Sequence, residues 1–360
     1  MIRTNNPDTF TPRRTRQRLH VALVYNGDRQ CAPDRPEDRG GTADLRSMIR
    51  SMARALRRAG YKVTVVPLAR NLFAFQRKLR RLAPDVVFNQ YDDVVHGALY
   101  EMRLPALVRM MGFPITGSPA LAVGLTRYKY MSASLLQGAG IRIPFCTEVL
   151  ERLSDVDRRV WSFPLIVQPS QEHAGMGLDR DSIVHSKKAL RDKMRVILRD
   201  FHQPVLVQSF LPGREFNVGI VGGRRLRVMP LAEVDYSLLP AEIPPIMSYT
   251  AKYIETAEEY KKTSVICPAT VEPDLARDII STALRAFRAV GGWGYGRVDI
   301  RLDSDSRPCV LEVNCNACLD EGYGLSRQAD RAGIAYHKLL QMVVKAALEG
   351  PPYDADIPML

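Results

Sequence analysis

The sequence predicts an α/β protein of more than one domain. Its first part alternates short apolar runs with segments of helical periodicity, the pattern of a parallel sheet with helices on its faces. After the Gly117-Ser118-Pro119 turn the rhythm changes to β-hairpins and longer helices. A chain of 360 residues also exceeds the usual size of a single hydrophobic core. We therefore expect an N-terminal parallel α/β domain followed by a region of mixed α and β structure.

Alternating strand and helix signals build the first domain. The expected elements, in chain order, are a strand at 19–25, a helix at 43–59, strands at 61–67 and 85–89 around a helix at 72–82, a helix at 99–111 and a short strand at 113–116. Gly60 follows the first helix, as a C-cap glycine would. In such a sheet, a ligand site should lie beyond the carboxyl ends of the strands.

Hairpins and helices dominate the rest of the chain. We expect a helix at 121–138, strands at 164–168 and 205–210, a hairpin of 215–221 with 224–230, a helix at 273–290 and a second hairpin of 296–302 with 309–314. Gly222-Gly223 provides the turn of the first hairpin. Residues 240–262 are rich in Pro, Tyr and Glu, which favours an irregular loop over a site.

Composition argues against several classes of protein. No run of about 18 apolar residues occurs, so no membrane-spanning helix is predicted. Residues 1–18 are polar and basic without an apolar stretch, which argues against a secretory signal and favours a disordered tail. Six cysteines are too thinly spread for a disulfide framework, which indicates a reduced, cytoplasmic protein.

The net charge of +12 raises the question of nucleic-acid binding. Apart from a short run at 13–18, however, the arginines are scattered and mixed with acids, and no nucleic-acid-binding motif is visible. A basic cleft for an anionic ligand such as a nucleotide fits the charge equally well. We therefore do not expect nucleic acid as the main partner.

The most informative segment is the predicted hairpin at 296–314. Arg297 and Asp299 lie two residues apart on one strand, and Glu312 and Asn314 do so on the next, so each pair shares a face. The hairpin can therefore bring together two carboxylates, an amide oxygen and a guanidinium. Mg²⁺ prefers oxygen ligands of this kind, with phosphate oxygens and water completing its shell. The alternative is a solvated face whose charges pair with one another.

Five segments in a fixed order extend this motif. They are HGALYEMRLPALVRMMGFPITGS (96–118), FPLIVQPS (163–170), VLVQSFLPGREFNVGIVGG (205–223), YTAKY (249–253) and GRVDIRLDSDSRPCVLEVN (296–314). Together they resemble the ATP-grasp superfamily and, within it, the D-alanine–D-alanine ligase family, from about Leu19 to Glu349. The resemblance implies a two-subdomain ATP-grasp fold behind the N-terminal domain. The implied bounds are 19–118 for the N-terminal domain, 119–204 and 205–350 for the two subdomains, and 351–360 for a tail.

The resemblance also implies the metal and phosphoryl chemistry. Asp299, Glu312 and Asn314 would hold two Mg²⁺ ions, with Mn²⁺ as an alternative, that bridge the phosphates of ATP. Arg297 would steady the transferred phosphoryl group or the acyl-phosphate. Relatives in this family are often dimers, so a homodimer is left open.

Two lysines and a loop are the implied phosphate contacts. Lys129 matches a lysine that contacts the ATP phosphates, a task that suits a long cationic side chain. Lys252 matches a lysine that reaches the γ-phosphate from a mobile loop. The loop that closes over the phosphates falls at 173–177, where its usual serine pair reads Ala174-Gly175.

The implied contacts to adenine and ribose lie further along the chain. Ser209 and Leu211 fall where the hinge between subdomains hydrogen-bonds adenine through its backbone. Gln208 stands where the family commonly has an acid, and its amide oxygen can still accept from the adenine amino group. Glu215 matches the acid that receives the ribose hydroxyls.

Departures from the family pattern bear on the substrates. Gln168 replaces the second phosphate lysine, a loss of charge that should weaken nucleotide binding by about 1–3 kcal/mol. Tyr323 aligns with the serine that binds the carboxylate of the second substrate. Asp320 and Glu321 add negative charge there, which disfavours a carboxylate and suits an amine or a guanidine, although a solvated loop is the alternative.

We therefore predict an ATP-dependent ligase that joins a small carboxylate to an amine through an acyl-phosphate, with amino acids other than two D-alanines as substrates. Two alternatives stay within the same fold. One is a true D-alanine–D-alanine ligase of cell-wall synthesis, and the other is an ATP-binding regulatory module with impaired catalysis, for which Gln168 is the motivating change. Nucleic-acid binding by the basic surface is a third.

Overall fold

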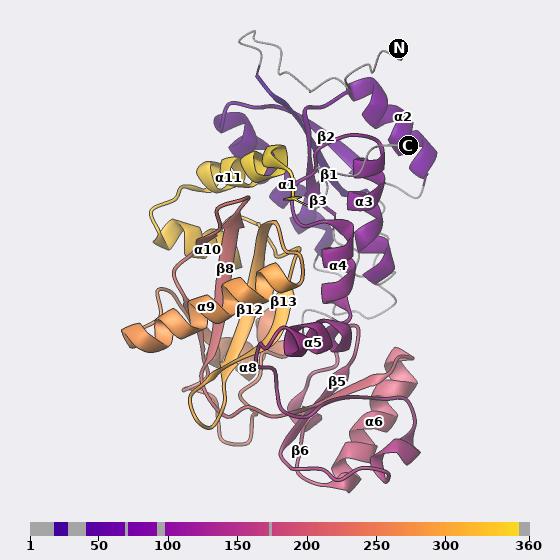
Figure 1. Ribbon diagram of the computed structural model, residues 1–360, viewed down its shortest axis with the longest axis vertical. Coiled ribbons are helices and arrows are strands. Elements are labelled where there is room, and N and C mark those ends of the chain that lie inside the picture. Colours follow the sequence, from indigo (N-terminus) through magenta and orange to yellow (C-terminus); the bar gives the residue numbers. More distant parts are fainter. Residues whose placement is uncertain (1–17, 28–40, 69–70, 92–97, 173–174, 353–360) are drawn as a thin grey trace, which may run out of the picture.

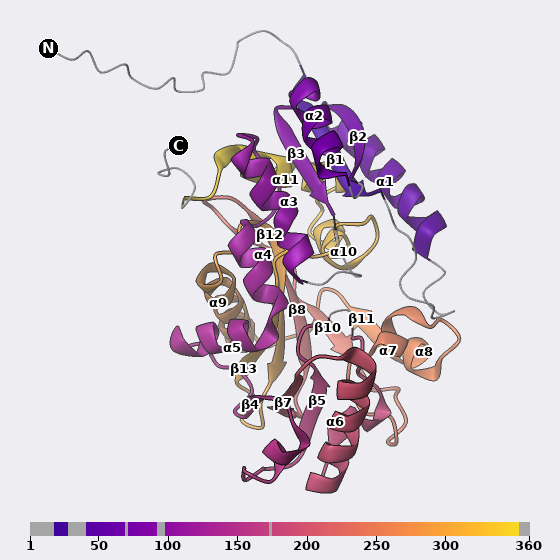
Figure 2. The ribbon, with the colours of Figure 1, turned by 90° about the vertical axis from the view of Figure 1, so that its right-hand side faces the viewer.

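The computed structural model describes residues 18–27, 41–68, 71–91, 98–172 and 175–352 (Figure 1). Three sheets follow one another along the long axis of the molecule (Figures 1 and 2). A parallel sheet lies at one end, the largest antiparallel sheet in the middle and a smaller antiparallel sheet at the other end. The predicted fold class, a parallel α/β region followed by mixed α and β structure, is confirmed.

The N-terminal sheet has the strand order β2-β1-β3 and is parallel throughout. Its strands are β1 (His20–Asn26), β2 (Lys62–Leu68) and β3 (Val86–Gln90). Helices α1 (Gly41–Arg58) and α11 (Tyr336–Glu349) pack on one face, and α2 (Leu72–Leu82) and α3 (Ala98–Met110) on the other. Because both faces are covered, the central strand is apolar along most of its length, as the sequence pattern indicates.

The strand predicted at 113–116 is reduced to a single parallel bridge between Val87 and Ile115. The Val87 N–H donates to Pro114 O at 2.8 Å, and the Thr116 N–H donates to Val87 O at 2.9 Å. Pro114 has no N–H of its own, so the ladder cannot continue through it.

The helix predicted at 121–138 is broken in two. Helix α4 (Ala120–Arg127) ends and α5 (Lys129–Gly138) begins at Tyr128, whose backbone is extended. In the last turn of α4 the Thr126 hydroxyl donates to Ala122 O at 2.9 Å, a bond that competes with the helix ladder. The break gives α5 a new direction and makes Lys129 its first residue (Figure 1).

The smaller antiparallel sheet has the order β4-β7-β5-β6. Its strands are β4 (Thr147–Leu150), β5 (Leu165–Pro169), β6 (Ile183–Val184) and β7 (Val205–Ser209). Helix α6 (Lys187–Phe201) covers one face, and Leu190, Met194 and Ile197 reach the apolar core there. The Ser186 hydroxyl caps this helix by accepting from Ala189 N.

The largest sheet has the order β11-β10-β8-β12-β13, with β9 paired to β8. Its strands are β8 (Glu215–Gly222), β9 (Arg227–Val228), β10 (Ala232–Asp235), β11 (Ser264–Ile266), β12 (Gly294–Leu302) and β13 (Pro308–Asn314). Helix α9 (Pro273–Ala289) covers one face, where Val298 and Ile300 meet Phe287 in the core. The predicted hairpin of 296–302 with 309–314 is confirmed. The hairpin predicted for 215–221 with 224–230 is confirmed in position, but its second strand is shorter than predicted and spans only Arg227–Val228.

The segment predicted as an irregular loop at 240–262 contains two short helices. They are α7 (Tyr249–Tyr253) and α8 (Glu258–Lys262). Ser248 caps the first by accepting from Ala251 N at 3.1 Å, a signal that the sequence does contain. The last helix before α11 is α10 (Gly324–Arg331), which packs on β8.

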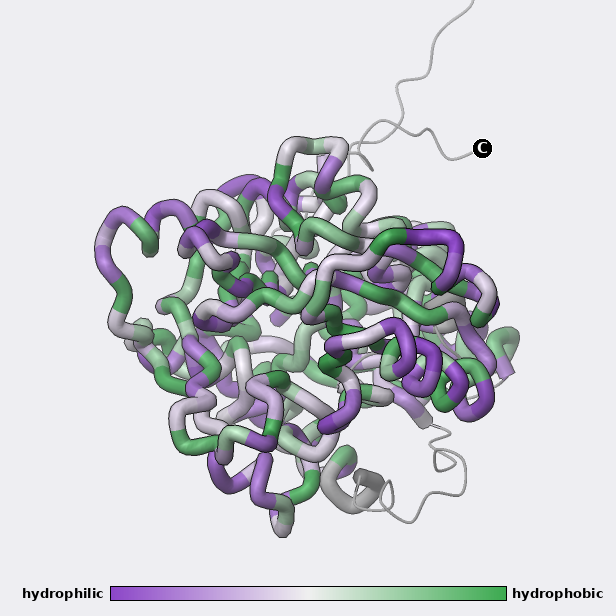
Figure 3. The backbone as a smooth tube through the Cα atoms, turned by 90° about the horizontal axis from the view of Figure 1, so that it is seen from below, coloured by the Kyte–Doolittle hydropathy of each residue, from purple (hydrophilic) through white to green (hydrophobic). Residues whose placement is uncertain are grey.

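Hydrophilic stretches gather along the outer turns of the chain, as the view from below shows (Figure 3). Within the described ranges, no helix combines the length and apolar character needed to cross a membrane.

Gly296 lies where α9 and β13 approach β12 most closely. A Cβ there would come within 2.4 Å of the Phe287 ring and 2.8 Å of Asn314 O. We expect Gly296→Ala to lower the free energy of unfolding by about 1–3 kcal/mol through overpacking. The control is Gly138→Ala, since a Cβ at Gly138 has nothing within 4 Å and the change should be neutral or stabilise by up to about 1 kcal/mol. Urea denaturation compares the two, and equal stabilities would contradict the packing argument.

Candidate active site

Polar side chains from three adjacent strands converge on the face of the largest sheet opposite α9. Asp299 on β12 lies in register with Asn217 on β8 and with Glu312 on β13. Arg297 holds Asp299 with two hydrogen bonds, Nε to Oδ1 at 2.6 Å and Nη2 to Oδ2 at 2.8 Å. Asn217 Nδ2 donates to Asp299 Oδ1 at 2.9 Å. The Asp299 carboxylate raises the pKa of the Arg297 guanidinium, which therefore stays charged.

A β-bulge sets the orientation of the β13 side chains. Asp299 pairs with Glu312 but the next residue, Ile300, pairs with Val310, so one residue of β13 is left over. The bulge changes the phase of the strand. Val310 and Val313 can therefore both face the core while Glu312 and Asn314 lie on the polar side.

Two lysines from separate helices face this row of carboxylates. Burial lowers the pKa of the Lys129 ammonium, and the Glu312 carboxylate opposes that effect more than any other neighbour. Burial also lowers the pKa of Lys252, Arg297 lowers it further, and Asp299 and Glu312 raise it. Lys129 begins α5 and Lys252 lies in α7, so two cations from separate helices lie within electrostatic reach of the predicted metal ligands.

A chain of amide side chains runs from Lys129 into the smaller sheet. Lys129 Nζ donates to Gln168 Oε1 at 2.8 Å. Gln168 Nε2 donates to Gln208 Oε1 at 3.2 Å, and Gln208 Nε2 donates to Thr147 Oγ1 at 3.3 Å. Gln168 and Gln208 are both buried. Gln168, predicted to stand in place of a second phosphate lysine, therefore orients Lys129.

Glu215 is enclosed by residues that the sequence analysis did not select. Tyr236 Oη donates to Glu215 Oε2 at 2.9 Å, and Arg301 Nη1 lies 3.2 Å from the same oxygen. Burial raises the pKa of Glu215, and Arg301 lowers it. Arg301 is itself buried and stacks on the Phe210 ring at 4.8 Å. Its position two residues beyond Asp299 on the same strand is a signal that could have identified it.

The predicted hinge residues lie beside these side chains. The Ser209 N–H donates to Cys146 O at 2.9 Å, and its hydroxyl accepts from Cys146 N at 3.1 Å. Leu211 is buried at the end of the same segment.

The predicted phosphate loop contacts the segment that carries Lys252. Gly175 O accepts from Tyr249 N at 3.0 Å, and a Cβ at Gly175 would come within 2.7 Å of the backbone at Met247 and Tyr249. Its φ of +79° also favours glycine. Ala174 lies outside the described residues.

The three predicted substrate residues lie in different environments. Asp320 is buried and its Oδ2 accepts from Cys318 Sγ at 3.0 Å. Glu321 is exposed and its Oε2 accepts from Ser51 Oγ of α1 at 2.6 Å. The Tyr323 side chain is 59% exposed. Cys318 also helps to raise the pKa of Arg297, so this thiol links the surroundings of Asp320 to those of Arg297.

The chemistry of the site suits a hard divalent cation bound with phosphate. Asp299, Glu312 and Asn314 provide two carboxylates and an amide oxygen on one sheet face, which is the donor set that Mg²⁺ accepts. No cluster of three or more His, Cys, Asp or Glu side chains with metal-binding geometry occurs in the described part of the chain.

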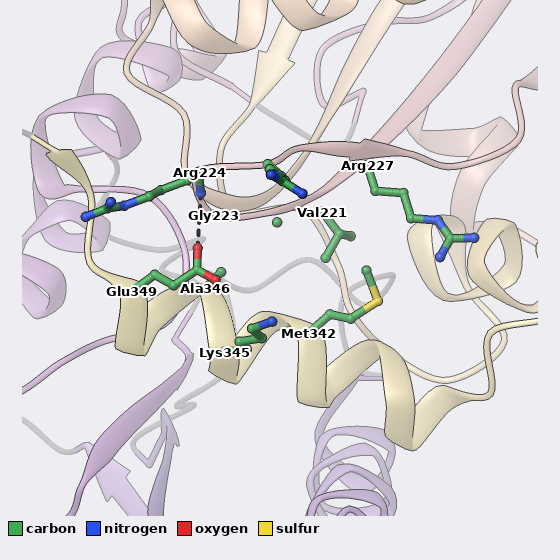
Figure 4. Close-up of a pocket in the computed structure, with 10 residues that line it drawn as sticks. Val221, Gly223, Arg224, Arg227, Met342, Lys345, Ala346 and Glu349 are labelled. Atoms are coloured by element: carbon green, nitrogen blue, oxygen red, sulfur yellow. Dashed lines mark hydrogen bonds between the residues drawn. The ribbon is translucent and has the colours of Figure 1, made fainter. Parts of the chain in front are cut away.

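A separate hollow of about 460 Å³ lies between the β8–β9 hairpin and α11 (Figure 4). Arg224 and Arg227 stand at its two ends and point away from each other, with Lys345 between them (Figure 4). It adjoins the end of β8 opposite Glu215 and Asn217, and none of the predicted site residues lines it.

Comparisons with known proteins agree with this arrangement. The protein y4sG of Sinorhizobium fredii, itself described as uncharacterized, is 28% identical over 322 residues, which cover 88% of this chain and 90% of that protein. A D-alanine–D-alanine ligase of a Marinomonas species is 28% identical over 300 residues, covering 82% and 88%. The crystal structure of a Bacillus anthracis D-alanine–D-alanine ligase complexed with ATP has the same fold, with a TM-score of 0.68, 20% identity and coverage of 94% of this chain and 100% of that one.

The family model described as the D-ala D-ala ligase C-terminus matches residues 145–345, which include β4 to β13 and the row of polar side chains on the largest sheet. Since this match spans more than half of the 360 residues, the chain belongs to the D-alanine–D-alanine ligase family.

Proposed function

We propose that this protein joins a small carboxylate to an amine, other than two D-alanines, through an acyl-phosphate formed from ATP. The coarser statement follows from the family: the chain is an ATP-dependent ligase that forms C–N bonds. The observation that carries the proposal is the convergence of Lys129 and Lys252 on the carboxylates of Asp299 and Glu312. Interleaved cations and carboxylates suit a polyphosphate bound with a divalent cation.

In the proposed reaction the acyl donor's carboxylate attacks the γ-phosphate of ATP, which gives an acyl-phosphate and ADP. The amine then attacks the acyl carbon and displaces phosphate. When bound, Mg²⁺ would neutralise phosphate charge between Asp299, Glu312 and Asn314. Arg297, fixed in direction by its two bonds to Asp299, would stabilise charge on the transferred group without having to reorganise. Lys129 and Lys252 would orient the phosphates.

For the nucleotide, we propose that the smaller and the largest sheets hold the base and ribose between them. Glu215 would accept from the ribose hydroxyls through Oε1, since Tyr236 and Arg301 both contact Oε2. Gln208, Ser209 and Leu211 would border the adenine. This assignment supports 119–204 and 205–350 as the two subdomains, and 19–118 as the domain in front of them.

For the acceptor, we propose that Asp320 favours an amine with a second positive charge or a guanidine. The buried Asp320 carboxylate carries a negative charge, which would attract a cationic acceptor and disfavour a carboxylate. Glu321 is exposed and bonded to α1, and it would act at most at the rim. The alternative acceptor is D-alanine itself, which the name of the Marinomonas relative supports.

The substrate proposal predicts that ADP release requires a carboxylate and an amine together. A screen of amino acids in pairs, read out by ADP formation, should give activity with a cationic amine as acceptor and none with D-alanine alone. Activity with D-alanine alone would establish the alternative. Silence with every pair would contradict the ligase assignment for these substrates.

Asp299 is predicted to be essential for turnover. Asp299→Asn keeps the side-chain volume but removes the charge that orients Arg297 and binds the cation, so ADP release should fall by about 100-fold or more. Circular dichroism and melting should show an intact fold. The control is Asp305→Asn, the same change in the exposed turn of the same hairpin, which should leave turnover unchanged. Normal turnover in Asp299→Asn would remove the metal assignment.

Gln168 is predicted to limit nucleotide affinity. Gln168→Lys places a second cation beside the triphosphate, and it should tighten Mg–ATP binding about tenfold, within the scale of about 1–3 kcal/mol for a charged hydrogen bond. Calorimetry measures the dissociation constant. Gln137→Lys, which adds the same charge at an exposed position of α5, tests for a nonspecific effect and should change little. Weaker binding in Gln168→Lys would show that the amide's hold on Lys129 matters more than charge.

A further inference from the structure

A half-buried to buried polar cluster lies directly behind the end of β13. Asn316 Nδ2 donates to Glu101 Oε1 on α3 at 2.5 Å and to Tyr91 O at 3.0 Å. Asn316 Oδ1 accepts from Tyr295 Oη on β12 at 3.0 Å. The amide group of Asn316 is thus held by both its nitrogen and its oxygen, from three separate segments. Such a group has little freedom to rotate.

The backbone of Asn316 meets the side chain of Asn314. The Asn316 N–H donates to Asn314 Oδ1 at 2.9 Å. Because a backbone N–H can only donate, the atom that it meets must be the amide oxygen and not the amide nitrogen. One lone pair of this oxygen is used by the N–H, and the second is left for a cation. The contact therefore fixes which atom of Asn314 faces the sheet's polar side.

Glu101 connects this contact to the phosphate side of the site. Its second oxygen, Oε2, lies 3.0 Å from Arg127 Nε, and the two side chains are 2% and 12% exposed. Arg127 is the last residue of α4 and lies two residues before Lys129. Burial and the carboxylates of Glu312 and Glu172 have larger effects on the pKa of Lys129, and the charge of Arg127 lowers it further. A buried carboxylate is stable only with such partners. Glu101 is therefore paired on both oxygens, once toward β13 and once toward α4.

We propose that Asn316 and Glu101 are positioning residues that hold the Asn314 amide oxygen in place for a divalent cation. The inference rests on the proposed function, since it assumes a cation at Asn314. Neither side chain would touch the cation or the substrates. Groups that orient metal ligands from behind typically change metal affinity by about 10–100-fold when they are removed.

The test measures the Mg²⁺ concentration that nucleotide binding requires. Calorimetry with the non-hydrolysable β,γ-imido analogue of ATP, repeated over a series of MgCl₂ concentrations, gives the Mg²⁺ concentration for half-maximal binding. Asn316→Ala should raise that concentration by about tenfold or more. Glu101→Gln keeps the volume of the side chain but removes the ion pair with Arg127 that fixes the direction of Glu101. The Asn316 amide would then be held less firmly, and the Mg²⁺ dependence should shift in the same direction. This variant tests the positioning role if Asn316→Ala does not fold.

The control separates positioning from loss of stability. Trp161→Phe removes a buried hydrogen bond, from Trp161 Nε1 to Val156 O at 2.9 Å, in the core beside the smaller sheet. It should lower the melting temperature and leave the Mg²⁺ dependence unchanged. If Asn316→Ala and Glu101→Gln behave like Trp161→Phe, the two residues are structural only and the inference is wrong.

The same experiment distinguishes the inference from the proposed function. Wild-type protein that binds the analogue in a Mg²⁺-dependent way supports a nucleotide and cation site, whatever the variants do. Wild-type protein that shows no such binding refutes the proposed function and the inference with it. The double variant of Asn316→Ala and Glu101→Gln should fall short of the product of the two single fold-changes, because contacting residues do not act independently. A fold-change in the double variant equal to the product of the two single fold-changes would contradict the inference that Asn316 and Glu101 act together.

Discussion

The site depends on the register of three neighbouring strands in the largest sheet. Asn217 on β8, Asp299 on β12 and Glu312 on β13 stand in one row because their strands pair at those positions. A slip of one residue would turn Asp299 into the core and Val298 onto the polar face. The core of valines and isoleucines against α9 therefore fixes the positions of the carboxylates. The bulge in β13 lets Val310 and Val313 face this core while Glu312 faces the polar side.

Alternation of charge keeps this row stable before any ligand arrives. Carboxylates gathered alone would repel one another, and so would lysines gathered alone. Here Arg297 lies against Asp299 and Arg301 against Glu215, while Lys129 and Lys252 lie within the field of Glu312. The cations are thus held in place by groups that a polyphosphate and its cation would partly replace. Such preorganisation reduces the reorganisation needed on binding.

The sequence predicts much of this because its signals are periodic and local. Spacing of two residues places Arg297 with Asp299 on one face, and alternating apolar runs identify the parallel sheet. Other features depend on contacts between distant segments. The break at Tyr128 and the short strand β4 leave little local pattern, and the cluster at Asn316 requires α3, more than 200 residues earlier, to lie behind β13. The β13 bulge cannot be predicted from residue type alone, since it depends on how β12 pairs.

We interpret Gln168 as standing in place of a second phosphate lysine, a change that would replace a charge with a fixed hydrogen-bond acceptor. A lysine at this position would add a full charge, but it would also repel Lys129. Gln168 instead accepts from Lys129 Nζ and is itself fixed by Gln208, which holds the remaining lysine toward the carboxylates. Lys129 also follows the break between α4 and α5, so its position depends on α3 through Arg127 and on the smaller sheet through Gln168. The position of Lys129 therefore depends on how the N-terminal sheet, the smaller sheet and the largest sheet are arranged. A change in that arrangement would move the Lys129 ammonium group relative to Gln168 and the carboxylates without unfolding any one sheet.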